Sequence, residues 1–274
     1  MSNLRLAYTV AGPDCHAPDP FAFRAPFGQA LEALAESGYK GIELQVRNPR
    51  EIDLTTLRRS VDGSGLTVAA IATGHVLAED GLHLSDPDRR EEAIARLEEI
   101  VDFAAEFKAM VTLGKSRGGA SPDKPSEVAS ALDAIGRVGS YAAAAGTIVA
   151  LEPQNRFNGP LLTSIADTVA SIENEGWEGV GICADTFHMA IEERSFSGAL
   201  VEAGRHLVHV QLGESHRGPM GDGNVPLAAV LHVLDALGYD GWLSMEHGQA
   251  GDSFAAARRS AQAVAVASAG PRGN

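Results

Sequence analysis

Four polar residues lie where short apolar runs end, and together they have the chemistry of a metal site. They are Glu152 in "TIVALE", Asp185 in "GVGICAD", Gln211 in "HLVHVQL" and Glu246 in "WLSME". Three carboxylates do not share a small site unless a cation compensates their charge. An all-oxygen donor set favours Mn²⁺ or Mg²⁺ over zinc. If the four side chains converge, the sequence predicts a site for one divalent metal ion.

The elements that would position these residues alternate between short β-prone runs and helical stretches. The expected strands occupy 4–10, 41–46, 66–72, 109–114, 147–152, 179–185, 206–212 and 242–246. The expected helices occupy 27–38, 86–107, 124–146, 162–176, 226–238 and 252–267, with weaker signals at 54–64 and 190–204. The strands are nearly continuous apolar runs, which is typical of a parallel sheet covered on both faces.

Alternation of this length predicts an α/β fold, a (β/α)8 TIM barrel that forms a single domain over residues 1–274. Active sites of such barrels lie at the carboxyl ends of the strands. All four polar residues are therefore expected at the barrel mouth. The sequence has no GxGxxG or GxxxxGK[ST] phosphate loop after a strand, which argues against a nucleotide-binding fold.

Composition indicates the class of protein and argues against some classes of partner. The apolar content of 45% and charged content of 21% are those of an ordinary globular protein. The 22 basic and 36 acidic residues give a net charge of −14, which argues against nucleic acid or an anionic membrane surface as a partner. No apolar run reaches the roughly 18 residues of a membrane span, and the first residues do not resemble a signal peptide. We therefore expect a cytoplasmic protein.

Several segments carry a resemblance to a known superfamily. The segments "ALEPQNRF", "ICADTFHMAIEE", "VHVQLGESHRGPMGDGNVP" and "LSMEH" resemble, in order and spacing, the xylose-isomerase-like sugar isomerases and epimerases. Within that superfamily the chain resembles the ketose 3-epimerases of the tagatose/psicose type. The segment "IATGHVLAEDGLHLSDPDRREEAIARL" is similar to the third-strand region of keto-sugar-acid epimerases. The resemblance covers nearly the whole chain.

This resemblance implies a site, a cofactor and partners. The implied ligands of one divalent ion, Mn²⁺ first with Mg²⁺ or Co²⁺ as alternatives, are Glu152, Asp185, Gln211 and Glu246. It also implies that Glu152 and Glu246 exchange protons with the substrate, and that His188 and Arg217 contact substrate oxygens. The implied partner is a small sugar or keto-sugar, and the implied assembly is a homo-oligomer, a dimer or tetramer.

These parts suit the removal of a proton from the carbon next to a ketone. The resulting enediolate carries negative charge, which a metal on the carbonyl and hydroxyl oxygens stabilises. One carboxylate can remove the proton from one face, and a second can return a proton to the other face and invert the centre.

Two positions depart from the ketose 3-epimerase pattern. Those enzymes usually carry His where this chain has Gln211, whereas relatives resembling hydroxypyruvate isomerase carry Gln in a similar "HVQ" motif. Gln still offers a neutral oxygen donor, so the metal site is retained while the epimerase assignment weakens. Asn158 stands where the epimerases often carry an acid, which puts the usual ketohexose contacts in doubt.

Other polar residues are candidates with a structural alternative. His75, after the third strand, is a candidate substrate contact or a loop histidine. Arg117 and Lys115, after the fourth strand, are candidates to bind a carboxylate or phosphate of the substrate, or are solvated loop charges. His209 shares the inward direction of the residue two positions later, so it is either a partner that orients that ligand or a core histidine. Glu43 is a candidate pocket residue at the end of the second strand.

Three activities remain open because they share the same first proton removal. They are epimerisation next to the carbonyl of a ketose or keto-sugar acid, aldose–ketose isomerisation of the hydroxypyruvate-isomerase type, and lyase chemistry by β-elimination. The superfamily also includes a type of endonuclease that cuts at abasic DNA, but the charge of −14 and the single set of ligands argue against it. The complete set of four ligands argues against a binding protein without catalysis.

Overall fold

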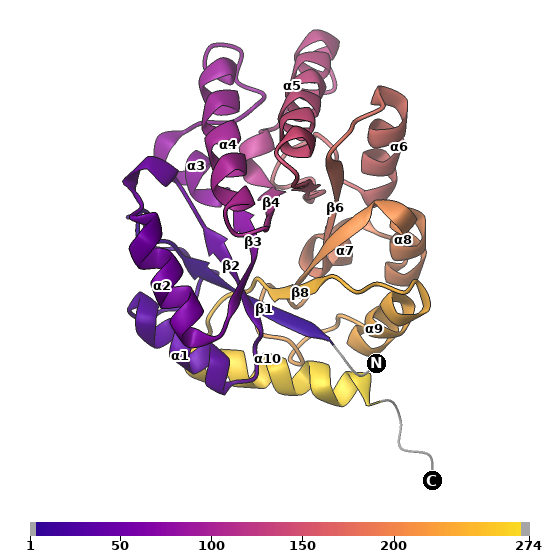
Figure 1. The fold of residues 1–274 in the computed structure, drawn as a ribbon. Coiled ribbons are helices and arrows are strands. Elements are labelled where there is room, and N and C mark those ends of the chain that lie inside the picture. The colour runs from indigo at the N-terminus through magenta and orange to yellow at the C-terminus, as the bar shows by residue number, and fades with distance from the viewer. Residues whose placement is uncertain (1–3, 270–274) are drawn as a thin grey trace.

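Eight parallel strands form a closed barrel, with each strand paired to the next and β1 closing on β8. The structure is a computed structural model that describes residues 4–269. The helices form an outer ring around the strands (Figure 1). This confirms the predicted (β/α)8 barrel. The expected domain range also includes residues 1–3 and 270–274, which lie outside the described residues.

The elements follow one another as a repeated strand and helix. The strands are β1 (Arg5–Ala11), β2 (Gly41–Gln45), β3 (Thr67–Ala72), β4 (Met110–Leu113), β5 (Val149–Leu151), β6 (Val180–Asp185), β7 (Leu207–Leu212) and β8 (Trp242–Met245). The helices are α1 (Phe27–Glu36), α2 (Leu54–Ser64), α3 (Gly74–Asp80), α4 (Arg90–Ala105), α5 (Pro125–Ala144), α6 (Ile165–Glu175), α7 (Thr186–Glu192), α8 (Phe196–Ala203), α9 (Leu227–Ala236) and α10 (Ser253–Ser268). Short 3₁₀ turns are η1 (Pro49–Glu51), η2 (Lys115–Arg117) and η3 (Gly204–His206). Within residues 4–269, no helix has both the length and the apolar character needed to cross a membrane.

The helices differ from the sequence-based expectation most clearly at the starts of α4 and α8 and in two short helices, α3 and α7, that the sequence did not indicate. The helix expected over 86–107 begins later, at Arg90, because the Asp86 carboxylate accepts backbone N–H groups of Asp88 and Arg89 and holds a turn there. The short helices α3 and α7 follow β3 and β6 almost directly. Asp185 caps α7 by accepting the Phe187 N–H at 2.7 Å, so one carboxylate ends a strand and begins a helix.

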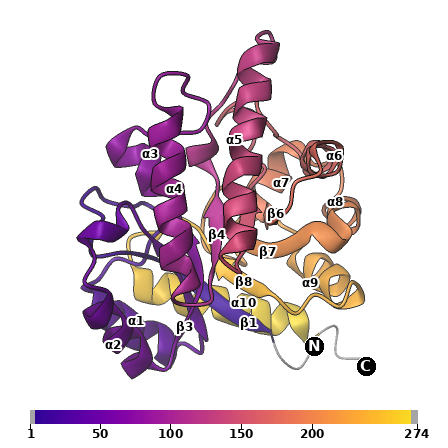
Figure 2. The same cartoon turned by 45° about the horizontal axis from the view of Figure 1, so that its top comes forward.

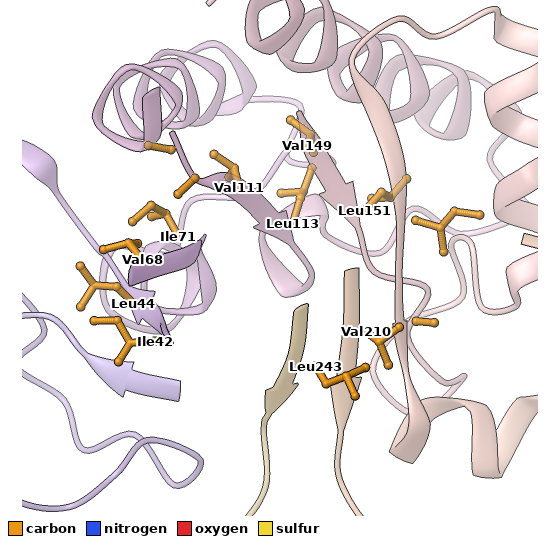
Figure 3. Close-up of a cluster of buried hydrophobic side chains, with 14 of the residues drawn as sticks. Ile42, Leu44, Val68, Ile71, Val111, Leu113, Val149, Leu151, Val210 and Leu243 are labelled. Carbon is orange, nitrogen blue, oxygen red and sulfur yellow. The ribbon is translucent and has the colours of Figure 1, made fainter. Parts of the chain in front are cut away.

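Alternation along the strands separates an apolar face from a polar one. Aliphatic side chains such as Ile42, Val111 and Leu151 belong to the main core cluster, and Figure 3 shows them along successive strands. The side chains between them point to the other face, because successive residues of a strand alternate. Near the amino ends of the strands, Ala7, Ala69 and Trp242 form a separate buried apolar cluster, and Trp242 pairs with the first residue of β1. The polar side chains that line the cavity described below lie at the opposite, carboxyl ends of the strands.

A glycine lets α5 pack closely on the segment that enters β6, the strand that carries Asp185. A Cβ at Gly139 would lie 2.3 Å from Val180 Cγ2 and 2.8 Å from the carbonyl oxygen of Glu178. Figure 2 shows α5 upright beside α4, with α6 and α7 on its other side. The close approach therefore helps to position β6.

Gly139→Ala is expected to lower the midpoint of urea unfolding, by an amount equivalent to about 1–3 kcal/mol, because the added methyl group overpacks this contact. The matched control is Gly63→Ala in α2, whose added Cβ meets nothing within 4 Å. The control should gain about 0.5–1 kcal/mol from helix propensity. Equal gains for both variants, measured by circular dichroism, would show that α5 does not need the close approach.

Candidate functional site

A cavity of about 440 Å³ opens at the carboxyl ends of the strands. Six of the eight predicted site residues line it: His75, Glu152, His188, Gln211, Arg217 and Glu246. Asp185 lies against this group, because its side chain bonds to Arg217. Arg117 does not line this cavity and lies beside a neighbouring one. The structure therefore brings seven of the predicted residues together.

The hydrogen-bond ladder of the barrel places the four candidate ligands. Asp185 and Gln211 are direct Cα partners between β6 and β7. Glu152 and Glu246 continue the ladder past β5 and β8, since their N–H groups donate to the carbonyls of the preceding strands at 3.0 and 3.1 Å. All four side chains therefore start from backbone positions that the sheet itself fixes.

Arg217 is the cation that the carboxylates share. Its guanidinium donates to Asp185 and to Glu246, and the centre of the guanidinium lies 4.7 Å from the ring of Phe21 and 4.8 Å from the ring of Phe187. Burial would lower the pKa of Arg217, but the surrounding carboxylates raise it above its ordinary value. The arginine is thus held charged between two aromatic rings.

The loop after β7 holds Arg217 in an uncommon backbone conformation. Its φ is +60°, in the left-handed region that non-glycine residues seldom adopt. The Arg217 N–H donates to the Glu214 carbonyl, and its own carbonyl accepts the Gly248 N–H, both at 2.7 Å. The buried Glu214 carboxylate accepts the N–H groups of Gly221 and Val225 at 2.9 and 3.1 Å. These hydrogen bonds therefore hold the backbone of Arg217 in its strained conformation.

Glu152 is oriented by residues of its own loop and of α7. Gln154 donates to Glu152 Oε2 at 2.7 Å, and His188 Nε2 lies 3.1 Å from Oε1. The backbone N–H of Asn155 donates to His188 Nδ1, so the ring proton lies on Nε2 and faces the carboxylate. Burial would raise the pKa of Glu152, but His188, Arg217 and Gln154 lower it below its ordinary value. Among the described residues, Oε1 accepts no hydrogen bond of good geometry.

A buried network beneath the cavity fixes the amide of Gln211. Glu43 is fully buried and accepts hydrogen bonds from Gln211 Nε2 at 2.8 Å and from Thr112 at 2.9 Å. His209 Nε2 lies 3.1 Å from the same carboxylate, so this histidine pairs with Glu43, the residue that binds the Gln211 amide. Gln211 Nε2 is occupied by its bond to Glu43. Gln211 Oε1, which accepts the Cys183 thiol at 3.2 Å, is therefore the amide atom that can bind a cation.

The site fits a divalent metal ion on grounds of charge and donor chemistry. Two buried carboxylates, Glu152 and Asp185, and the partly buried Glu246 surround one guanidinium, so 3 − 1 = 2 negative charges stay uncompensated when all are ionised. Burial raises the pKa of Glu246 well above its ordinary range, Arg217 opposes this, and the neighbouring carboxylates add to it. Donor atoms of Glu152, Asp185 and His188 lie within 4.8 Å of one another. A divalent ion would supply the missing charge.

His75 forms part of the cavity wall as a clamp between two loops. Its ring nitrogens lie 2.6 Å from Glu79 and 3.3 Å from Asp19. Burial would lower the pKa of His75, but Asp19, Cys15 and Glu79 raise it to about 11. The protonated ring therefore ties the loop after β1 to α3.

Several residues of the site were not found by sequence reasoning. Phe21 lies in the loop after β1, and no motif near it in the sequence indicates that it contacts Arg217. Phe187 does stand inside the "DTFHM" segment beside a predicted residue. Glu214 stands inside "LGES", where its role in the loop depends on atoms seven and eleven residues later.

Comparison with known proteins matches this architecture. The family described as xylose isomerase-like TIM barrel matches residues 31–266. The L-ribulose 3-epimerase of Mesorhizobium japonicum is 33% identical over 224 residues, which are 80% of this chain and 74% of that protein. The D-psicose 3-epimerase of Agrobacterium fabrum is 29% identical over 81% of this chain and 79% of its own length.

Solved structures show the same fold. The apo structure of the 3-keto-D-glucoside 4-epimerase from E. coli superposes with a TM-score of 0.81 over 96% of this chain and 100% of that chain. At 22% sequence identity, this likeness concerns the fold alone. The match over most of the chain and the identity to the Mesorhizobium protein lead to one conclusion: the chain belongs to the xylose isomerase-like TIM barrel family.

Proposed function

We propose that the protein is a metal-dependent sugar epimerase that inverts the carbon next to the carbonyl of a ketose or keto-sugar acid. The observation that carries this proposal is the pair of carboxylates, Glu152 after β5 and Glu246 after β8, that line one cavity, where Glu246 pairs with Arg217 and Glu152 with His188. The relatives named as L-ribulose and D-psicose 3-epimerases support it. The cavity of about 440 Å³ is of the size that small-molecule sites have.

The proposed cofactor is one divalent metal ion, Mn²⁺ first with Mg²⁺ or Co²⁺ as alternatives. Its proposed ligands are Glu152, Asp185, Gln211 and Glu246. A bound divalent ion supplies Lewis-acid stabilisation of negative charge on substrate oxygens. The uncompensated charge of the three carboxylates and the oriented Gln211 Oε1 support this assignment.

The two carboxylates act as a base and an acid on opposite faces of the substrate. Glu152 takes the proton from the carbon next to the carbonyl, and the electron pair moves onto the carbonyl oxygen. Glu246 gives a proton to the other face of the same carbon, so the centre inverts and the substrate's composition stays unchanged. The reverse reaction exchanges the two roles.

Two donor groups support this transfer, one by orienting the base and one by binding the substrate. His188 directs its Nε2 proton toward the Glu152 carboxylate and keeps it oriented. The Arg217 guanidinium, fixed by its two aromatic neighbours, donates to substrate oxygens as negative charge develops on them. The expected homo-oligomer and cytoplasmic location stay predictions.

The proposal is tested by hydrogen exchange. The protein is loaded with Mn²⁺ in D₂O and offered ketoses, keto-sugar acids and hydroxypyruvate, and deuterium incorporation is followed by NMR. Epimerisation predicts deuterium on the carbon next to the carbonyl, together with the inverted sugar as product. An aldose product would indicate the isomerase alternative, and an unsaturated or cleaved product the lyase. Absence of exchange with every compound would contradict the proposed function.

Glu152→Gln and Glu246→Gln are each expected to lower kcat by roughly 10²–10⁴-fold, because each removes a proton-transfer group while keeping the size of the side chain. The measurement is the rate of deuterium incorporation at saturating sugar. Glu32→Gln, an exposed substitution in α1, serves as the control and should leave the rate unchanged. Near-normal turnover by Glu246→Gln would show that two carboxylates are not required.

Asp185→Asn is expected to weaken Mn²⁺ binding by about tenfold or more, because it removes one negative charge from the donor set. Asn is as good a helix cap as Asp, so the start of α7 should be retained. The measurement is the Mn²⁺ dissociation constant by calorimetry, with the exposed Asp222→Asn as the matched control. Unchanged affinity in Asp185→Asn would remove this residue from the ligand set.

A further inference from the structure

A second cavity, of about 430 Å³, adjoins the one already described. Lys115 and Asn158 line both cavities, so the two spaces meet at these side chains. We call the second space the side pocket. Its polar lining used below consists of His83, Ser85, Lys115, Arg117, Gly119 and Asn158.

The charge of the side pocket is opposite to that of the chain. Two cationic residues, Lys115 and Arg117, line it. No Asp or Glu is among its lining residues in the described part of the chain. This occurs in a protein with a net charge of −14. Such a local excess of positive charge favours an anionic ligand.

Arg117 is a buried guanidinium without a counterion. It is 1% exposed, and no Asp or Glu within residues 4–269 lies within 4.0 Å of it. Its terminal nitrogen donates to the Leu161 carbonyl at 2.7 Å, while its Nε has no hydrogen-bond partner among the described residues. Burial lowers the pKa of Arg117 to about 10, and the charge of Glu152 opposes this only in part. A buried charge of this kind is costly unless an anion pairs with it.

The loop that carries these cations is shaped by a glycine. Gly118 has a φ of +76°, and a Cβ there would lie 2.0 Å from Ser85 Oγ and 2.5 Å from His83 Nδ1. The following Gly119 N–H donates to Ser85 Oγ at 3.0 Å. The loop after β4 therefore packs directly on the segment before α4, which brings hydrogen-bonding groups from two segments to one pocket.

Lys115 is the cation best placed to reach a ligand. Its side chain is exposed, it forms no ion pair within residues 4–269, and its ammonium lies 5.9 Å from the ring of Phe21. Arg117, in contrast, braces the carbonyl of Leu161. The bond to Leu161 accounts for one nitrogen of Arg117. It does not account for the absence of an acidic partner of Arg117, or of an ion pair of Lys115, within residues 4–269.

We propose that the side pocket binds an oxyanion, a phosphate or a carboxylate, that the substrate carries at the end away from its reacting carbonyl. The inference rests on the proposed function and narrows the substrate class from keto-sugars in general to anionic ones. Lys115, at the junction of the two cavities, contacts the oxyanion and selects for it. Arg117 supplies the buried positive charge behind it.

The first test compares anionic and neutral substrates of the same length. Deuterium exchange is measured for D-ribulose against D-ribulose 5-phosphate, and for D-fructose against its 6-carboxylate, D-fructuronate. The wild-type protein should prefer an anionic member by about tenfold or more in kcat/KM, and the preferred anion identifies phosphate or carboxylate. Lys115→Gln should reduce that preference by about tenfold. Exposed Lys40, before β2 at the opposite end of the barrel, gives the control Lys40→Gln, which should keep it.

A second test does not depend on turnover. The dissociation constant of inorganic phosphate is measured by calorimetry for the wild-type protein, Lys115→Gln and Lys40→Gln. Only Lys115→Gln should weaken phosphate binding, by about threefold or more. If no sugar is exchanged but phosphate binding depends on Lys115, the proposed function fails and the anion site stands. A preference for the neutral sugars, or equal phosphate binding by all three proteins, would overturn the anion site.

Discussion

Buried negative charge at the mouth of the barrel is the constraint on which the rest of the site depends. Glu152 and Asp185 are buried and Glu246 is partly buried at the carboxyl ends of three strands, where carboxylates are costly unless they are paired. A closed ring of strands cannot turn these side chains away from one another, because the ladder fixes the backbone at each position. Their charge must therefore be balanced from the loops or by a bound cation. Arg217 supplies part of that balance.

The surrounding structure holds the charged groups from below and from above. Beneath the cavity, Glu43 engages the amide nitrogen of Gln211, so the amide oxygen, which accepts the Cys183 thiol, is the atom available to bind a cation. Above it, Phe21 and Phe187 confine the guanidinium of Arg217, whose backbone is strained. Preorganised groups of this kind can stabilise developing charge without the cost of reorganising during a reaction.

The anionic site and the cationic side pocket meet at Lys115 and Asn158. A substrate with a carbonyl at one end and an oxyanion at the other would find a matching charge at each end. That arrangement would orient the molecule and place the carbon next to its carbonyl between Glu152 and Glu246. The same arrangement would disfavour the reversed orientation, because the oxyanion would then face three carboxylates.

Local pattern in the sequence determined the eight strands and the positions of the four candidate ligands. Continuous apolar runs and turn residues act over a few positions, so Asp185 and Glu246 could be placed at strand ends without knowledge of the fold. The short helices α3 and α7 were missed because each is only seven residues long. The start of α4 was placed too early because the turn at Asp86 depends on its side chain.

Only the tertiary structure decided which residues surround those ligands. The contact of Phe21 with Arg217 joins loops almost two hundred positions apart, and Glu43 meets Gln211 across the barrel axis in the same way. The sequence left Arg117 as either an anion-binding candidate or a solvated loop charge, and the fold buries it beside the side pocket. The physical reason is that hydrogen-bond periodicity is encoded between near neighbours, whereas these contacts exist only once the eight strands close into a ring.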